Sequence, residues 1–295
     1  MSKKHPVIVV TGSSGAGTTT VKRSFEHIFR REEINAAVLE GDSFHSVTRM
    51  EFNAAVENAE DNHQRPPSHF GPECNHFDKI EETFRQYGET GVCQRRYYVH
   101  SAAEAAEFNS QLGTSLKPGE FTPWETIPPG SDILFYEGLH GGIRTDKVDV
   151  AQHVDLLIGV VPVVNLEWIQ KIHRDTGERG YSAEAVTQTI LRRMRDYVEY
   201  ICPQFSNTDI NFQRVALVDT SNPFIVRDIP TLDESVVVIR FRKPNMADFP
   251  YLLSMIKGSF MSRRNNIVVP GGKMGLAMEI ILTPLIKELM NKRHS

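Results

Sequence analysis

A glycine-rich segment between a short apolar run and a helical pattern constrains this chain more than any other feature. Residues 7–10 are all Val or Ile, and apolar residues recur at helical spacing from Val21 to Phe29. A strand, loop and helix in this order expose backbone N–H groups and a helix N-terminus, which together bind phosphate. We therefore predict that ATP phosphates bind along this loop, which consists of Gly12, Ser13, Ser14, Gly15, Ala16, Gly17, Thr18 and Thr19.

Thr18 departs from the usual form of such a loop. The common pattern is G-x-x-x-x-G-K-[ST], in which the lysine places a positive charge on the β- and γ-phosphates. Thr18 stands at the lysine position, so we expect a cation from elsewhere in the chain to replace it. Thr19 keeps the hydroxyl that ordinarily binds magnesium. A glycine-rich turn without a ligand is the alternative interpretation.

Further apolar runs indicate an α/β fold. Residues 37–39 run into Glu40-Gly41-Asp42, residues 133–136 end at Glu137, and residues 156–161 and 235–239 are further candidate strands. Continuous apolar strands are typical of a sheet covered by helices on both faces. We expect one domain over residues 1–295, with insertions, and long loops at residues 58–76 and 107–131.

The region after residue 164 predicts two helices joined by a polar segment. Asn165 and Ser182 are candidate helix caps, and apolar residues from Val186 to Ile201 form one stripe. Between the helices, His173 to Gly180 is charged and contains glycine. We expect a mobile lid around residues 171–182.

Composition limits the class of protein. The formal charge is −4 and the pI is about 6.3, which gives no general footprint for nucleic acid or an anionic membrane. Three cysteines without a C-x-x-C pair argue against a disulfide framework. The longest apolar run, residues 156–164, is too short to span a membrane. We expect a cytoplasmic enzyme.

Acidic residues at two strand ends are candidates for catalysis. Asp42 follows the second expected strand, at the sheet edge where ligands bind in α/β folds, and could accept a hydroxyl proton. His45 and Arg49 follow closely and suit a phosphate or sugar hydroxyls. Glu137 stands where an acidic residue closes a magnesium site opposite the loop. A turn role for Asp42 and a helix-capping role for Glu137 are the alternatives.

The expected lid concentrates positive charge. Lys171, Arg174 and Arg179 accompany Asp175, and they could close over the migrating phosphoryl group in place of the missing loop lysine. A solvated helix end is the alternative. Arg192, Arg193 and Arg195 lie on the polar side of the next helix, where a solvated or intersubunit face competes with a ligand role.

Two other interpretations are disfavoured. His69, Cys74 and His76 match no standard zinc spacing. The Asn-Lys-x-Asp motif, with which regulatory GTPases read guanine, is absent.

Five strings in this chain resemble the bacterial phosphoribulokinases of the Calvin cycle, of the short proteobacterial type. The likeness spans nearly the whole chain. It implies a mixed, mostly parallel sheet of the P-loop nucleoside-kinase kind, with helices on both faces, and transfer of phosphate from ATP to the 1-hydroxyl of D-ribulose 5-phosphate. The strings are the phosphate loop Gly12–Thr19, Leu39–His45, Leu134–Gly141, Val160–Asp175 and Phe205–Val215.

The resemblance also implies roles for individual residues. Asp42 is the expected base, Lys171 and Arg174 serve phosphoryl transfer, and Asp175 is a second catalytic acid that could share magnesium with Thr19 and Glu137. The expected ribulose 5-phosphate contacts are His45, Arg49, His100 and Arg179.

Regulation follows from the same resemblance. The bacterial enzymes are homo-oligomers activated by NADH and inhibited by AMP. Residues expected at the regulatory site or in transmitting its signal are Arg31, Arg193, Arg240 and Arg263. Two alternatives remain: a related uridine or pantothenate kinase, and a nucleotide-binding regulatory module without turnover.

Overall fold

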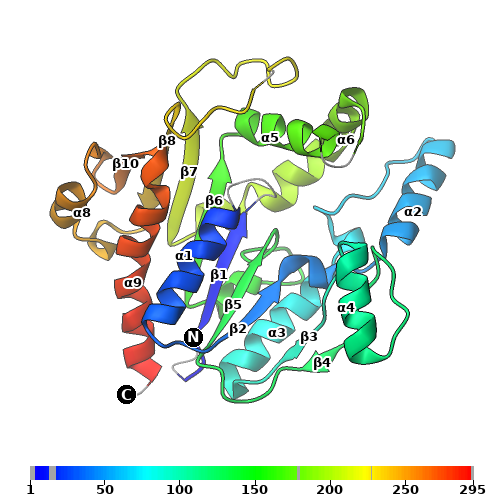
Figure 1. The fold of residues 1–295 in the computed structure, drawn as a ribbon, viewed down its shortest axis with the longest axis horizontal. Coiled ribbons are helices and arrows are strands. Elements are labelled where there is room, and N and C mark those ends of the chain that lie inside the picture. The colour runs from blue at the N-terminus through cyan, green and yellow to red at the C-terminus, as the bar shows by residue number, and fades with distance from the viewer. Residues whose placement is uncertain (1–3, 13–17, 178–179, 227, 294–295) are drawn as a thin grey trace.

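The computed structural model describes residues 4–12, 18–177, 180–226 and 228–293, and an eight-stranded sheet runs through this part of the chain (Figure 1). The strand order is β2-β5-β1-β6-β7-β8-β10-β9. The first five strands are parallel to one another, and β8, β10 and β9 add antiparallel pairs. The mixed, mostly parallel sheet expected from the sequence is therefore confirmed.

The strands of this sheet are short. They are β1 (Val7–Gly12), β2 (Ala36–Glu40), β5 (Ile133–Gly138), β6 (Leu156–Pro162), β7 (Ile210–Ala216), β8 (Ser235–Phe241), β9 (Phe260–Arg263) and β10 (Asn266–Pro270). A separate hairpin pairs β3 (Gln94–Arg95) with β4 (Glu125–Thr126).

Helices connect the strands and cover both faces. They are α1 (Thr18–Arg31), α2 (Arg49–Asp61), α3 (Phe77–Thr90), α4 (Ala102–Leu112), α5 (Val164–Gly177), α6 (Ala183–Asp196), α7 (Gln204–Asn207), α8 (Phe249–Met255) and α9 (Met274–Arg293). In Figure 1, α1 and α9 lie side by side, and α5 and α6 lie above the ends of the parallel strands.

Two cores sandwich the sheet because side chains of β1 alternate between its faces. Ile8 and Val10 pack with the apolar faces of α1 and α9. Val7 and Val9 pack with α3 on the opposite face. The runs read from the sequence are continuous because both faces are buried.

The structure corrects the expected start of the first helix after residue 160. Asn165 does not cap α5, because the helix begins at Val164, and the Asn165 side chain instead donates to the carbonyl of Thr220 at 2.9 Å. Ser182 does cap α6, since its hydroxyl accepts from the N–H of Ala185 at 3.1 Å.

The polar segment between these helices is also shorter than expected. Residues 173–177 form the last turns of α5, so much of the expected lid is helical. The two expected long loops likewise begin inside helices, with residues 58–61 in α2 and 107–112 in α4. These helical turns were not predicted, because their residues are mostly polar and show no apolar stripe at helical spacing.

Candidate functional site

Three parallel strands end at one edge of the sheet, and their ends carry the candidate residues. Glu40 of β2 pairs in register with Glu137 of β5, and Thr11 of β1 pairs with Gly138. Gly41 and Gly138 approach each other so closely that a Cβ on Gly41 would lie 2.7 Å from the Cα of Gly138. Only glycine therefore fits at this junction, which draws the turn of Asp42 toward Glu137.

The phosphate loop starts from this edge. A Cβ on Gly12 would lie 2.2 Å from the carbonyl oxygen of Val160 in β6, so glycine is required where the loop leaves β1. Ser13, Ser14, Gly15, Ala16 and Gly17 lie outside the described residues, and so do the side chains of Thr18 and Thr19. Thr18 is the first residue of α1, which places the amino terminus of that helix directly after the loop.

Asp42 lies in a single helical turn, Gly41–Phe44, and two histidines face its carboxylate. The Nε2 atom of His45 lies 3.4 Å from Oδ1, and that of His100 lies 3.9 Å from Oδ2. The side chain is 44% exposed, so one edge of the carboxylate is open while protein atoms enclose the rest. Burial alone would raise the pKa of Asp42, but the nearby His45 lowers it to about 2. Asp42 is therefore ionised at neutral pH.

The His45 ring is buried and held from its other side. Its Nδ1 atom lies 2.8 Å from Oδ1 of Asn75, and its ring lies 4.6 Å from that of His69. His69 in turn stacks on Phe52 at 4.0 Å. His69 matched no zinc spacing in the sequence, and no group of three metal-binding side chains occurs among the described residues. The structure shows it instead as the ring packed behind His45.

Arg96 fixes the backbone of the turn that carries Asp42. Its guanidinium donates to the carbonyls of Ser43 at 2.7 Å and His45 at 2.5 Å. The same group lies over the rings of Phe121 and Trp124. Burial lowers the pKa of Arg96 to about 10, which leaves it charged at neutral pH. Sequence reasoning missed Arg96 because its partners are some 50 residues away.

Arg49 begins α2 and reaches the same region through Tyr98. Thr48 and Glu51 form a capping box at this helix start, and the N–H of Arg49 donates to the carbonyl of Gly119 at 2.9 Å. The Arg49 guanidinium lies 5.8 Å from the Tyr98 ring, which also contacts His45 and His100. The Tyr98 ring thus connects Arg49 to His45 and His100, the two histidines that face Asp42.

Glu137 is partly buried among other carboxylates. Burial and, to a smaller extent, the charge of Glu40 raise its pKa from 4.5 to about 7, while Lys22 of α1 opposes the shift. A divalent cation beside Glu137 would compensate this repulsion, and carboxylate oxygens are ligands that magnesium prefers. The residues present therefore fit a magnesium ion at this position.

The basic residues of α5 form a compact group on the helix. Lys171 Nζ lies 2.5 Å from one oxygen of Asp175, and Arg174 Nε lies 3.1 Å from the other. Burial would raise the pKa of the Asp175 carboxyl, but Lys171 and Arg174 hold it below its ordinary value. Burial lowers the pKa of Lys171 against the pull of Asp175. Arg179 lies outside the described residues.

The arginines of α6 differ in their surroundings. Arg195 is exposed, and Arg192 pairs with Glu60 of α2 at 2.5 Å. Arg193 lies 5.9 Å above the Phe70 ring, and its charge lowers the pKa of both His69 and Lys171, after the larger effect of burial. Arg193 therefore lies between the residues around Asp42 and those of α5.

Gln204, a buried amide that the sequence did not single out, joins the segments around this edge. Its Oε1 atom accepts from Thr11 Oγ1 at 3.0 Å and from the N–H of Gly142 at 2.9 Å. Its Nε2 atom donates to the carbonyls of Leu139 and Tyr200 at 2.9 and 2.8 Å. One side chain thus links the end of β1, the loop after Glu137 and the segment that follows α6.

The arginines expected to take part in regulation lie on four different elements. Arg31 at the end of α1 contacts Thr283 and Glu279 of α9, and Arg193 lies on α6. Arg240 of β8 donates to the carbonyl of Phe205 at 2.6 Å. Arg263 ends β9, and both it and Arg240 are in register with Asn266 of the strand between them.

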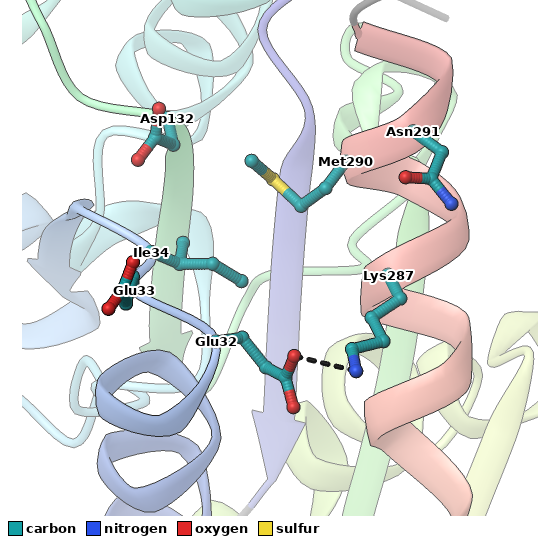
Figure 2. Close-up of a pocket in the computed structure, with 7 residues that line it drawn as sticks. All are labelled: Glu32, Glu33, Ile34, Asp132, Lys287, Met290 and Asn291. Carbon is teal, nitrogen blue, oxygen red and sulfur yellow. Dashed lines mark ion pairs between the residues drawn. The ribbon is translucent and has the colours of Figure 1, made fainter.

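A hollow of about 370 Å³ lies between the end of α1 and α9, next to the segments that lead into β2 and β5 (Figure 2). An ion pair between Glu32 and Lys287 spans it at 2.8 Å. With Glu33 and Asp132 also in its lining, the hollow is acidic. These two residues precede the first residues of β2 and β5, whereas Asp42 and Glu137 lie at the carboxyl ends of the same strands. It is therefore separate from the site around Asp42.

Comparisons with known proteins agree on one family. The family model "Phosphoribulokinase / Uridine kinase family" matches residues 7–221. The chain is 61% identical to a phosphoribulokinase of Nitrobacter vulgaris, over 99% of each chain, and 60% identical to the chromosomal phosphoribulokinase of Cupriavidus necator, over 99% of this chain and 98% of the relative. The solved structure of phosphoribulokinase from Rhodobacter spheroides superposes with a TM-score of 0.90 at 54% identity, covering 100% of each chain.

Proposed function

This chain belongs to the phosphoribulokinase and uridine kinase family, and we propose that it transfers the γ-phosphoryl group of ATP to the 1-hydroxyl of D-ribulose 5-phosphate. The product would be ribulose 1,5-bisphosphate, the substrate of carbon dioxide fixation. The observation that carries the proposal is the open Asp42 carboxylate, with His45 and His100 beside it and Arg49 close by. A base within a cationic pocket suits an acceptor that already bears a phosphate.

Asp42 would orient the sugar hydroxyl and accept its proton. Its pKa of about 2 makes it a weak base, so it cannot remove the proton early in the reaction. This is compatible with phosphoryl transfer, whose loose transition state needs little nucleophile activation before the bond to the leaving group lengthens. Positioning of the hydroxyl is then the main contribution of Asp42.

Lys171 and Arg174 would supply the positive charge that Thr18 does not. Asp175 holds both side chains on one side of α5, so they can act together on the transferred group. The same ion pairs favour Asp175 as the residue that orients these cations. Arg179 would complete the lid over the sugar phosphate.

Glu137 and Thr19 would hold the magnesium ion that accompanies ATP, with Asp175 as a further candidate. The ion would neutralise charge on the β- and γ-phosphates. Support for Glu137 comes from its raised pKa, because a carboxylate that is destabilised by its neighbours gains most from a bound cation.

Regulation by NADH and AMP in a homo-oligomer completes the proposal. Arg31, Arg240 and Arg263 would bind the effectors, and Arg193 would pass the signal to the site. Arg193 lies close enough to both His69 and Lys171 for its charge to lower their pKa values, which supports its role in passing the signal. Titration of NADH into the kinase assay tests it, and an unchanged rate would contradict it.

Acceptor-dependent release of ADP tests the proposed reaction. With magnesium and ATP, ribulose 5-phosphate should elicit ADP, whereas uridine and pantothenate should not. Turnover with either of the latter alone would assign the chain to another branch of the family. Tight nucleotide binding without turnover on any acceptor would favour a regulatory module. No helix in the described ranges is both long and apolar enough to cross a bilayer.

A further inference from the structure

The side chain of Asn75 has only one possible orientation. Its Nδ2 atom lies 2.9 Å from the carbonyl oxygen of His69 and 2.7 Å from that of Gly71. Carbonyl oxygens only accept, so the amide NH₂ must face them and the amide oxygen must face His45. Asn75 is 6% exposed, which makes the reverse orientation, with the amide oxygen facing two carbonyl oxygens, strongly unfavourable.

This orientation determines the proton on His45. The Oδ1 atom of Asn75 lies 2.8 Å from Nδ1 of the ring, so Nδ1 must carry a hydrogen and donate it. The other nitrogen, Nε2, faces the carboxylate of Asp42 at 3.4 Å. A neutral ring with its hydrogen on Nδ1 would place a lone pair against that anion. The imidazolium form, with hydrogens on both nitrogens, satisfies both neighbours.

We propose that Asn75 is a positioning residue that fixes the protonation pattern of His45 and thereby holds a positive charge beside Asp42 and the acceptor. The functional half of this inference rests on the proposed reaction, because it assumes that the acceptor binds next to His45.

The histidines packed against the His45 ring carry no positive charge at neutral pH that could replace its own. The titratable groups that face the ring are Asp42, His69, Tyr98 and His140, which come from four separate segments. Burial lowers the pKa of His69 and of His140 to about 3 in each case, so both rings are neutral at pH 7.

Without the amide oxygen of Asn75, the His45 ring can donate a hydrogen bond to Asp42 without carrying a positive charge. A neutral imidazole with its hydrogen on Nε2 can donate to the carboxylate while Nδ1 carries a lone pair. Replacement of Asn75 by leucine should therefore convert His45 to the neutral Nε2–H form and remove one positive charge from the acceptor pocket.

The backbone around His45 is held independently of the Asn75 side chain. The N–H of Ser46 donates to the carbonyl of Cys74, and that of His76 to the carbonyl of Phe44, both at 2.9 Å. Arg96 holds the turn from its other side. The substitution should therefore change the proton on His45 more than the place of Asp42.

The test is ¹⁵N NMR of the full-length protein with labelled histidine at pH 7. The chain has 11 histidines, and the His45→Gln variant identifies the His45 signals. The inference predicts that both Nδ1 and Nε2 of His45 are protonated in the unmodified protein, and that Nδ1 loses its hydrogen in Asn75→Leu. Asn75→Asp keeps an acceptor at this place and should keep Nδ1 protonated. An unprotonated Nδ1 or Nε2 of His45 in the unmodified protein would overturn the inference.

Kinetics separate a positioning role from a structural one. Asn75→Leu should raise the KM for ribulose 5-phosphate roughly tenfold to hundredfold, the range for a lost charged hydrogen bond, while the KM for ATP stays within about twofold. Asn109→Leu is the matched control, because Asn109 of α4 also makes three hydrogen bonds, and its partners are Thr114 and Leu116. Equal changes in both KM values, or the same loss in the control, would contradict the role.

The two readouts keep the inference distinct from the proposed function. If the unmodified protein does not phosphorylate ribulose 5-phosphate, the proposed function fails, while the NMR comparison still decides how Asn75 controls His45. If Asn75→Leu does not fold, the unmodified protein and Asn75→Asp still decide the position of the proton.

Discussion

The environment of Glu137 destabilises its carboxylate form, and this yields a quantitative prediction. Burial and the neighbouring carboxylate of Glu40 raise the pKa of Glu137 from 4.5 to about 7. Without a bound cation, the folded protein therefore takes up a proton at Glu137 more readily than the unfolded chain does. The stability from this protonated carboxyl is fully present below about pH 4.5 and is lost as pH rises through about 7.

The size of this effect follows from the two pKa values. Each pH unit between 4.5 and about 7 corresponds to about 1.4 kcal/mol, which gives a loss of about 3 kcal/mol by pH 8, as an upper value. Between pH 5 and pH 8, the loss attributable to Glu137 is about 2 kcal/mol. Glutamine keeps the shape of the side chain and cannot ionise. The Glu137→Gln variant should therefore lose about 2 kcal/mol less than the original protein over this range.

Urea denaturation at pH 5 and pH 8, without metal and at one protein concentration, measures the difference. Glu107→Gln, on the exposed part of α4, is the control and should behave like the original protein. Addition of magnesium and ATP at pH 8 should then stabilise the original protein more than Glu137→Gln. Identical pH dependence in the original protein and Glu137→Gln would refute the account of the Glu137 environment.

Three further predictions concern single side chains. Asp42→Asn should lower kcat by about 10² or more in steady-state kinetics while calorimetry finds ATP binding unchanged, and an unaltered kcat would exclude its role as base. Arg49→Ala should raise the KM for ribulose 5-phosphate, and a change confined to the KM for ATP would mean that its contact is misassigned. Gln204→Leu removes four hydrogen bonds and should lower the free energy of unfolding by roughly 2 kcal/mol or more, measured with urea; a loss below about 0.5 kcal/mol would contradict the junction described for it.

The sequence predicted the half of the sheet that surrounds the phosphate loop because those strands are buried on both faces. Continuous runs such as residues 7–10 and 133–136 have no other common interpretation once a glycine loop or a carboxylate follows them. The expected runs at 156–161 and 235–239 also proved to be strands, as β6 and β8.

The strands at the antiparallel side of the sheet were harder to predict from the sequence. Strands β7, β9 and β10 were not predicted individually, since β7 is half polar and β9 is short and largely exposed. Their pairing depends on partners that are distant in sequence, and local spacing does not encode it. The family resemblance supplied the expectation of a mixed sheet.

Some residues of the candidate site could be predicted from the sequence and others could not. Asp42 and Glu137 could be found from the sequence because each directly follows an apolar strand. Asn75, Arg96 and Gln204 could not, because each bonds a residue of the site, His45, Ser43 and Thr11 respectively, that lies 30 to 193 residues away. An isolated asparagine or glutamine has no local signal that separates a buried network residue from a surface residue.

The most direct test of the central claim is the identity of the phosphorylated acceptor. Purified protein would be incubated with magnesium, ATP and ribulose 5-phosphate, and ³¹P NMR would follow the sugar phosphates. The account predicts stoichiometric ADP and a second phosphate ester at carbon 1, with a rate greatly reduced in Asp42→Asn. Absence of a bisphosphate, or an equal rate in that variant, would contradict it.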